Sequence, residues 1–412
     1  MGVCIGAFIA SCGRGEVDRN TPQEIVEAEA SEEPRSTTLQ PAATHTPVPS
    51  ATKPQEPSHI PSPTAFRVGP TYLERYNPLT GELVEDESHL YQNPILVSVT
   101  NFPPSARPQA GLSAASHVWE ISIGQGMTRF LAVYYGDFAD ELLEMNEDRI
   151  DQAETYVVGP VRSGRVPYEE IKLLYPPGRL YIRYASPEVL EQLSGWETVF
   201  AEDPNNVNSA GIFVEDLEDL SEEIADPGDL SGLVFDSLPM TSGVDAEDFM
   251  IVYNYFNHVG WSYYPSSGAY ARSQDLSIGE GELFPAVERM TGEQLQFENV
   301  LVLFARHKFE NLVGTILDIE LQYLTSAVGY LLRDGKLQEI RWSTRSANLE
   351  LWDLEGNVMP LKHGKTFFEI LSYESTWDSD ERVFRFHSPP LPTLTPTTTP
   401  TSTPVPSDTP SP

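Results

Sequence analysis

Cysteine is nearly absent from this chain of 412 residues, which holds only Cys4 and Cys12. Everything after residue 12 therefore lacks a thiol for a disulfide, a cysteine-ligated zinc or a cysteine nucleophile. The eight histidines are scattered and form no H-E-x-x-H or H-x-x-x-H pair, so we expect no metal site. Gly124-Gln125-Gly126 lacks the third glycine of a dinucleotide-binding loop and is interpreted as a turn, and no cofactor is expected.

Basic residues are also scarce, with 26 Lys and Arg against 61 Asp and Glu and a formal net charge of −35. Phosphate binding requires clustered lysine and arginine, so this balance argues against nucleic acid as a partner. The acidic stretches at residues 137–154 and 215–229 are interpreted as solvated surface. Calcium binding was the alternative for them, but no D-x-[DN]-x-[DN]-G loop is present.

The chain contains no apolar run of the roughly 18 residues that a membrane-spanning helix needs. A shorter apolar stretch at the amino terminus ends in Ile9-Ala10-Ser11-Cys12-Gly13. Small residues before a cysteine at the end of an apolar stretch are typical of a bacterial lipoprotein signal, in which the thiol receives a diacylglycerol. The sequence therefore predicts a signal peptide at residues 1–12, lipidation of Cys12, and an exported protein anchored to the outer face of the cell membrane. Because the leader has no basic segment, we expect the natural start to lie upstream of Met1.

Proline is concentrated at the two ends of the chain. Residues 13–65 and 389–412 are rich in Pro, Thr and Ser and poor in apolar residues, so we expect a disordered tether and a disordered tail. The intervening body has enough apolar residues for a sizeable core.

Hydrophobic patterning divides the body into two parts. Residues 66–235 alternate apolar strand candidates with helical signals, as at 93–100, 117–123, 128–135, 166–174, 180–184 and 187–193. Residues 236–388 instead hold many short strand candidates separated by turns such as Asp334-Gly335. We therefore predict an α+β fold: an N-terminal mixed α/β layer followed by a mainly antiparallel β part, flanked by disordered tails.

Several motifs resemble the YerB-type lipoproteins, a bacterial family whose two-part globular domain has no assigned activity. In the first part these are Ala106-Arg107-Pro108-Gln109-Ala110-Gly111-Leu112-Ser113 and Val158-Gly159-Pro160-Val161-Arg162-Ser163-Gly164-Arg165. In the second part they include Tyr270-Ala271-Arg272 and Arg333-Asp334-Gly335-Lys336. The resemblance covers most of residues 77–371. It implies a surface lipoprotein with an α/β part and a β part, and no particular chemistry.

The candidate ligand-binding residues are Arg107, Arg129, Arg162 and Arg165, with Glu120 and Asn101 at comparable strand ends. Each arginine adjoins glycine or proline, or ends a predicted strand, where loops of an α/β sheet commonly form binding sites. A guanidinium group suits the two oxygens of a carboxylate or phosphate. The alternative is that these arginines make internal bridges to Glu120 and to backbone carbonyls.

Two functions follow from these residues. The preferred one is a non-catalytic lipoprotein, held in the lipid bilayer through Cys12, that binds an envelope protein or a peptidoglycan fragment through an arginine-lined face. The alternative is a cell-envelope hydrolase that uses Glu120 and a second acidic residue, because the spacing of paired carboxylates is spatial and cannot be read from the sequence.

Overall fold

The computed structural model describes residues 67–68, 75–147, 156–200, 203, 206 and 208–393. Cys12, the predicted leader and tether, and the predicted tail beyond residue 393 lie outside these described residues. Residues Pro61–Pro412 belong to one compact unit. Within the ranges described, no helix is both long enough and apolar enough to cross a membrane.

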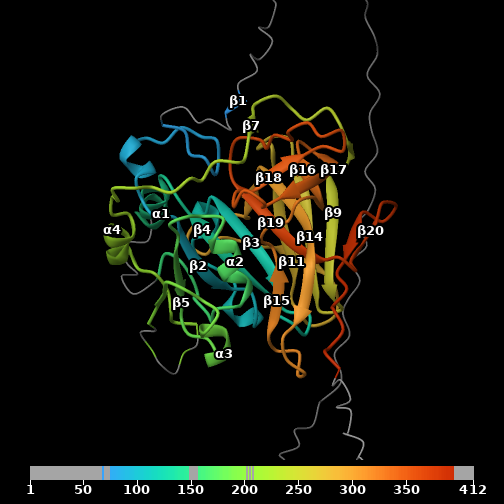
Figure 1. Cartoon of the computed structure of the whole chain (residues 1–412), viewed down its shortest axis with the longest axis horizontal. Helices are drawn as coiled ribbons and strands as arrows, with labels where there is room; N and C mark the ends of the chain where they lie inside the picture. The colour runs from blue at the N-terminus through green and yellow to red at the C-terminus, as the bar shows by residue number, and fades with distance from the viewer. Residues whose placement is uncertain are drawn as a thin grey trace, which may run out of the picture. The chain divides into compact units, whose positions relative to one another are not determined.

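A twelve-stranded mixed sheet forms the centre of this unit (Figure 1). Its main path runs β18-β17-β16-β14-β19-β3-β4-β2-β5-β6, and two more strands pair with β14 and β17. From the first part of the chain it takes β2 (Ile95–Thr100), β3 (His117–Ser122), β4 (Thr128–Tyr134), β5 (Arg179–Ile182) and β6 (Trp196–Thr198). From the second part it takes β8 (Val244–Asp245), β14 (Asn299–Phe309), β15 (Leu317–Glu320), β16 (Ala327–Arg333), β17 (Lys336–Ser343), β18 (Glu350–Trp352) and β19 (Thr366–Ser372).

A seven-stranded sheet packs on one face of the large sheet. It consists of β9 (Asp248–Asn254), β10 (Asn257–Tyr264), β11 (Ala269–Asp275), β12 (Leu283–Pro285), β13 (Gln296–Phe297), β20 (Thr376–Asp378) and β21 (Val383–Arg385). Aromatic rings fill the space between the sheets: the Trp261 and Phe297 rings lie 4.9 and 5.1 Å from the Phe367 ring of the large sheet. A two-stranded ribbon pairs β1 (Arg67–Val68) with β7 (Phe235–Asp236).

The helices are short and gather with β2, β4 and β5 rather than with the second sheet (Figure 1). They are α1 (Phe138–Glu147), α2 (Pro167–Lys172), α3 (Pro187–Leu190) and α4 (Leu217–Leu220), with 3-10 turns η1 (Glu87–Leu90), η2 (Pro104–Ala106), η3 (Leu112–Ala114) and η4 (Val214–Asp216). Proline is the first residue of both α2 and α3, where its fixed φ and missing N–H are tolerated. The apolar residues of α2 cover the face of the large sheet that is opposite the second sheet.

The turn between β16 and β17 shows how local sequence sets the strand pairing. Asp334 and Gly335 connect the strands, with φ values of 54° and 73°. Two consecutive positive φ values match the right-handed twist of a two-residue hairpin, and Asp-Gly is among the sequences that adopt them readily. The hairpin pairs Arg333 with Lys336 and continues in register to Ala327 and Trp342.

The predicted α+β class is confirmed at this level, because a mixed sheet with a few short helices is what the chain forms. The second part is less uniformly antiparallel than the prediction implies, since β19 pairs in parallel with both β14 and β3, and β21 pairs in parallel with β9. The β3–β19 pairing also joins the predicted ranges 66–235 and 236–388 into one continuous sheet. Their separation as two domains therefore remains a prediction from the sequence pattern.

Candidate functional site

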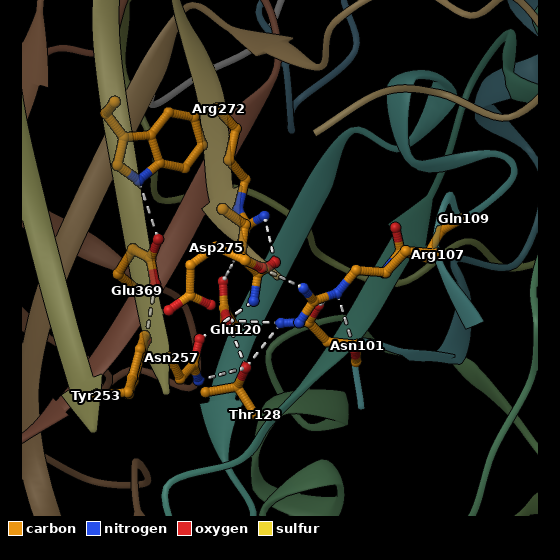
Figure 2. Close-up of polar contacts among 12 residues, drawn as sticks. Asn101, Arg107, Gln109, Glu120, Thr128, Tyr253, Asn257, Arg272, Asp275 and Glu369 are labelled. Carbon is orange, nitrogen blue, oxygen red and sulfur yellow. Dashed lines mark hydrogen bonds and ion pairs between the residues drawn. The ribbon is translucent and has the colours of Figure 1, made fainter. Parts of the chain in front are cut away.

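An ion pair between Glu120 and Arg272 lies between the two sheets (Figure 2). Glu120 comes from β3 and Arg272 from β11, and Arg272 Nη2 lies 2.7 Å from Glu120 Oε2. Their exposed fractions are 0% and 1%. The guanidinium lies over the rings of Phe130 and Phe367, at 5.2 and 5.5 Å from the ring centroids. Alternate residues of a strand face the same side, so Glu120 shares the buried face of β3 with Val118.

The second oxygen of Glu120 is also fully engaged. Thr128 Oγ1 donates to Glu120 Oε1 at 2.5 Å, and Asn101 Nδ2 donates to the same oxygen at 3.1 Å. Asn101 follows the last residue of β2 directly and is completely buried. Hydrogen bonds to both oxygens offset much of the cost of removing the carboxylate from water.

A second carboxylate, Glu369 of β19, is paired in register with Glu120 on the neighbouring strand. The Trp261 indole N–H donates to Glu369 Oε1 at 3.0 Å, and the Tyr253 hydroxyl donates to Oε2 at 2.7 Å. Burial, together with the charge of Glu120, raises the pKa of Glu369 to about 8. Because this value exceeds neutral pH, Glu369 holds its proton at neutral pH while its neighbour Glu120 is matched by Arg272.

Arg107 connects this network to the protein surface. Its Nε donates to both Asn101 O and Asn101 Oδ1 at 3.1 Å, and its Nη1 donates to the backbone oxygen of Asp275 at 2.7 Å. Burial, and then the charge of Arg272, lower the pKa of Arg107 to about 10. The guanidinium also lies over the Phe102 ring at 4.9 Å. Arg107 thus ties the loop after β2 to the end of β11.

Arg107 also lines a pocket of about 260 Å³ between this loop and the β11–β12 connection. Its polar lining residues are Arg107, Gln109, Gln274 and Asp275, and the apolar ones are Pro104, Pro108, Leu276, Phe284, Pro285, Ala286 and Val287. Gln274 accepts a hydrogen bond from Arg272 Nη1 at 2.9 Å, which links the pocket wall to the buried ion pair. Glu120 and Glu369 do not line this pocket, and both have exposed fractions of 0%. A substrate therefore cannot reach either carboxylate in this structure, and the geometry does not support a hydrolase that uses Glu120.

The other three predicted arginines meet at the carboxyl ends of β2 and β5, which run parallel. Arg129 of β4 lies opposite Thr100, the last residue of β2. Arg162 belongs to the segment that bridges to β2, and its Nε donates to Thr100 Oγ1 at 3.2 Å. The pKa of Arg129 is lowered to about 10, first by burial and then by the charges of Arg165 and Arg162. We call Arg129, Arg162 and Arg165 the arginine cluster.

No carboxylate within the described residues pairs with any member of the arginine cluster. Arg129 Nη1 donates to the backbone oxygen of Ser163 at 3.4 Å, and Arg165 Nη1 donates to that of Gly164 at 3.1 Å. Arg162 Nη2 donates to the Asn208 side-chain oxygen at 2.8 Å. The Nε atoms of Arg129 and Arg165 are buried and have no hydrogen-bond partner among the residues that the structure describes. Burial lowers the pKa of both Arg162 and Arg165.

The structure thus separates the predicted site residues into two groups. Asn101, Arg107 and Glu120 join one hydrogen-bonded network, which faces the second sheet. The arginine cluster binds other partners, namely the side chains of Thr100 and Asn208 and the backbone oxygens of Ser163 and Gly164. That one face carries all four arginines stays a prediction. Arg107 makes contacts of the kind expected from the alternative interpretation, since it donates to the backbone oxygens of Asn101 and Asp275. Glu120 does form an ion pair, but its partner is Arg272 rather than one of the four predicted arginines.

Arg272 and Glu369 were missed as site residues, although the sequence carried a signal for both. Glu369 is the one charged residue in Phe367-Phe368-Glu369-Ile370-Leu371, and Arg272 directly follows the apolar Ala269-Tyr270-Ala271. A charge that a strand buries requires a partner. Two charges of opposite sign in apolar strands, such as Glu120 and Arg272, are therefore candidates for pairing.

Comparison with known proteins places both parts of the chain in one family. Residues 79–214 match the N-terminal domain model of the protein family of unknown function DUF3048, and residues 249–368 match its C-terminal domain model. The chain is 24% identical over 313 residues to "Putative lipoprotein YerB" of Bacillus subtilis (strain 168), an alignment covering 70% of this chain and 81% of that protein. The crystal structure of YerB protein from Bacillus subtilis superposes with a TM-score of 0.54 at 24% identity, covering 72% of this chain and 96% of that one. The superposition supports a shared fold.

Proposed function

The chain belongs to the DUF3048 family, and from this premise we propose that it is an extracytoplasmic membrane-anchored lipoprotein whose body binds a carboxylate-bearing ligand of the cell envelope through the arginine cluster. The anchor is the lipidated Cys12, which precedes the long Pro/Thr/Ser-rich tether. The description of the Bacillus subtilis relative as a lipoprotein supports this part of the proposal. A random coil as long as the proposed tether, about 53 residues, has a root-mean-square span of about 40 Å, so such a tether would let the body act away from the membrane surface.

The observation that carries the ligand proposal is the lack of a carboxylate partner for Arg129, Arg162 and Arg165 among the described residues. The chain has 61 acidic residues and only 26 basic ones, so carboxylates are abundant and guanidinium groups are not. Gathering three of these scarce cations, with Arg129 only 5% exposed, costs free energy through desolvation and mutual repulsion. Such an arrangement is typical of a binding site, where the ligand supplies the missing charge.

The position and chemistry of the cluster indicate the class of ligand. It lies at the carboxyl ends of the parallel strands β2 and β5, where ligands of open α/β sheets commonly bind. A guanidinium group presents parallel N–H donors that match the two oxygens of a carboxylate. Peptidoglycan stem peptides and acidic protein segments both carry such groups in the cell envelope.

Binding is expected to depend on Arg162, which is half-buried and therefore accessible to a ligand. Replacing it with methionine removes the charge and retains most of the apolar stem. The substitution Arg162→Met should weaken binding of a synthetic stem peptide with free carboxylates by roughly tenfold or more, because a hydrogen bond to a charged group contributes about 1.5–3 kcal/mol. Isothermal titration calorimetry on the full chain in detergent measures the effect.

Arg306→Met serves as the matched control. Arg306 is an exposed arginine of β14 that pairs with Glu320 at 3.3 Å, away from the cluster. The control should bind the stem peptide as the unmodified chain does, and an amidated stem peptide should bind to neither. Equal affinities for the Arg162 variant and the control would refute the proposal. Binding of inorganic phosphate without any binding of the stem peptide would show that the site takes phosphate instead.

A further inference from the structure

A pocket of about 480 Å³ lies at the β6 end of the large sheet, and no member of the arginine cluster lines it. It is bounded on one side by β5 and β6 and on the other by the segment from Gly211 to Leu220, which includes η4 and α4. The second sheet does not contribute to its lining. The pocket is therefore formed by the first part of the chain alone.

The floor of this pocket is apolar and aromatic. Tyr181, Ile212 and Leu220 are buried residues of the main core, and Phe213 packs against them. Phe200, at the rim, is 80% exposed, which is unusual for a phenylalanine. An apolar floor beside an exposed aromatic ring is suited to the hydrocarbon portion of a ligand.

The rim of the pocket is strongly acidic. Four carboxylates line it, from Glu197, Glu215, Asp216 and Asp219. The one basic lining residue is Arg179, whose Nη2 is paired with Glu197 Oε1 at 2.8 Å. Asp216 accepts a hydrogen bond from the backbone N–H of Phe213 at 2.8 Å, which fixes the position of its side chain. Among the described residues, no basic side chain forms an ion pair with Glu215, Asp216 or Asp219.

The Tyr181 hydroxyl lies near charged groups of the pocket, namely Arg179, Glu197 and Asp216. Burial raises the pKa of this hydroxyl, the charge of Arg179 lowers it, and the carboxylates of Glu197 and Asp216 raise it. The Arg179 guanidinium lies over the Tyr181 ring at 5.5 Å from its centroid, which shows that this floor accommodates a cationic group.

The sheet edge beside the pocket supplies a second recognition element. β6 is the last strand of the sheet order and pairs with β5 on one side. No described strand lies on its other side. Glu197 and Thr198 of β6 are exposed and also line the pocket. An extended peptide placed along such an edge gains main-chain hydrogen bonds while its side chains enter adjacent pockets.

We propose that this pocket docks an extended segment of a partner protein by taking up a lysine or arginine side chain. The aliphatic stem of that side chain lies on the apolar floor, and its charged end meets the carboxylates of the rim. The choice of a basic partner follows from charge complementarity, since the rim has four carboxylates against one already paired arginine. This site has the opposite charge preference to the arginine cluster and stands independently of it.

The test uses the full chain and a fluorescein-labelled peptide of ten residues in which lysine alternates with valine. At physiological ionic strength, anisotropy should show saturable binding, and a peptide with glutamate in place of lysine should not bind. The double variant Glu215→Gln/Asp219→Asn should weaken binding at least about tenfold, since each lost charge-assisted contact is worth a factor of this order. The control Glu218→Gln/Asp226→Asn removes the same net charge from exposed positions that do not line the pocket.

A third variant, Thr198→Trp, fills the pocket from the exposed strand β6 without altering its charge, and it should abolish binding. Far-ultraviolet circular dichroism and the unfolding midpoint confirm that each variant is folded. Equal losses in the pocket variant and its control would show attraction to the overall acidic surface and overturn the proposal. Retention of binding by Thr198→Trp, or binding of the glutamate peptide, would overturn it as well.

Discussion

Replacing Arg272 with methionine is expected to lower the free energy of unfolding by about 3–5 kcal/mol, the cost of breaking a buried ion pair by removing one partner. The substitution leaves the Glu120 carboxylate between the sheets with only the Thr128 hydroxyl and the Asn101 amide as donors. Methionine retains an apolar stem against the Phe130 and Phe367 rings, so the loss reports charge rather than packing.

A double-mutant cycle separates the ion pair from the other contacts of Arg272. Glu120→Gln removes the charge but leaves a carbonyl oxygen for Thr128 and Asn101. The variant with both Arg272→Met and Glu120→Gln should therefore be more stable than Arg272→Met alone, even though it carries an additional substitution. Urea unfolding followed by tryptophan fluorescence gives the four free energies. Purely additive effects of the two substitutions would show that the pair is not what stabilises this interface.

The same ion pair shows what the sequence could and could not predict. The strands at residues 93–100, 117–123 and 128–135 were predicted almost correctly as β2, β3 and β4, because continuous β-branched and aromatic runs specify a buried strand locally. The neighbours of these strands could not be predicted. β19 pairs with β3 although about 250 residues separate them, and no periodicity encodes such a pairing. The predicted boundary at residue 235 lies where the hydrophobic pattern changes, but the large sheet contains strands from both sides of that boundary.

The predicted site illustrates the same limit. Scarcity of basic residues singled out Arg129 and Arg162, and their lack of carboxylate partners in the described part of the chain supports the proposal that they bind a ligand. Glu120 was identified as a strand-end residue, but its partner Arg272 lies on another sheet. Glu369 acquires its properties from donors on β9 and β10 and from the adjacent Glu120, all of which come together only through tertiary structure. Local sequence indicates that a charge is buried, whereas the fold determines which groups surround it.

Glu369 is expected to make the protein less stable as the pH rises from about 4.5 towards 8. Burial and the Glu120 charge raise the pKa of Glu369 from 4.5 to about 8. Between these values the folded chain retains a proton that the unfolded chain has released. Stability then falls as the pH rises, by at most about 1.4 kcal/mol per pH unit from this one group, and the loss is complete once the pH exceeds the folded value.

Glu369→Gln isolates this contribution because glutamine is neutral at every pH and can still accept a hydrogen bond from Trp261. Relative to the unmodified chain, the variant should gain unfolding free energy progressively across this pH range. The gain should reach several kcal/mol above pH 8. Tyr253→Phe provides the complementary test. The Tyr253 hydroxyl lowers the pKa of Glu369 in the folded chain. Its removal should therefore extend the loss of stability to higher pH, while the onset near pH 4.5 stays the same. Urea unfolding at intervals from pH 4.5 to 9 measures both effects, and a pH-independent difference for Glu369→Gln would show that the buried carboxyl does not titrate in this range.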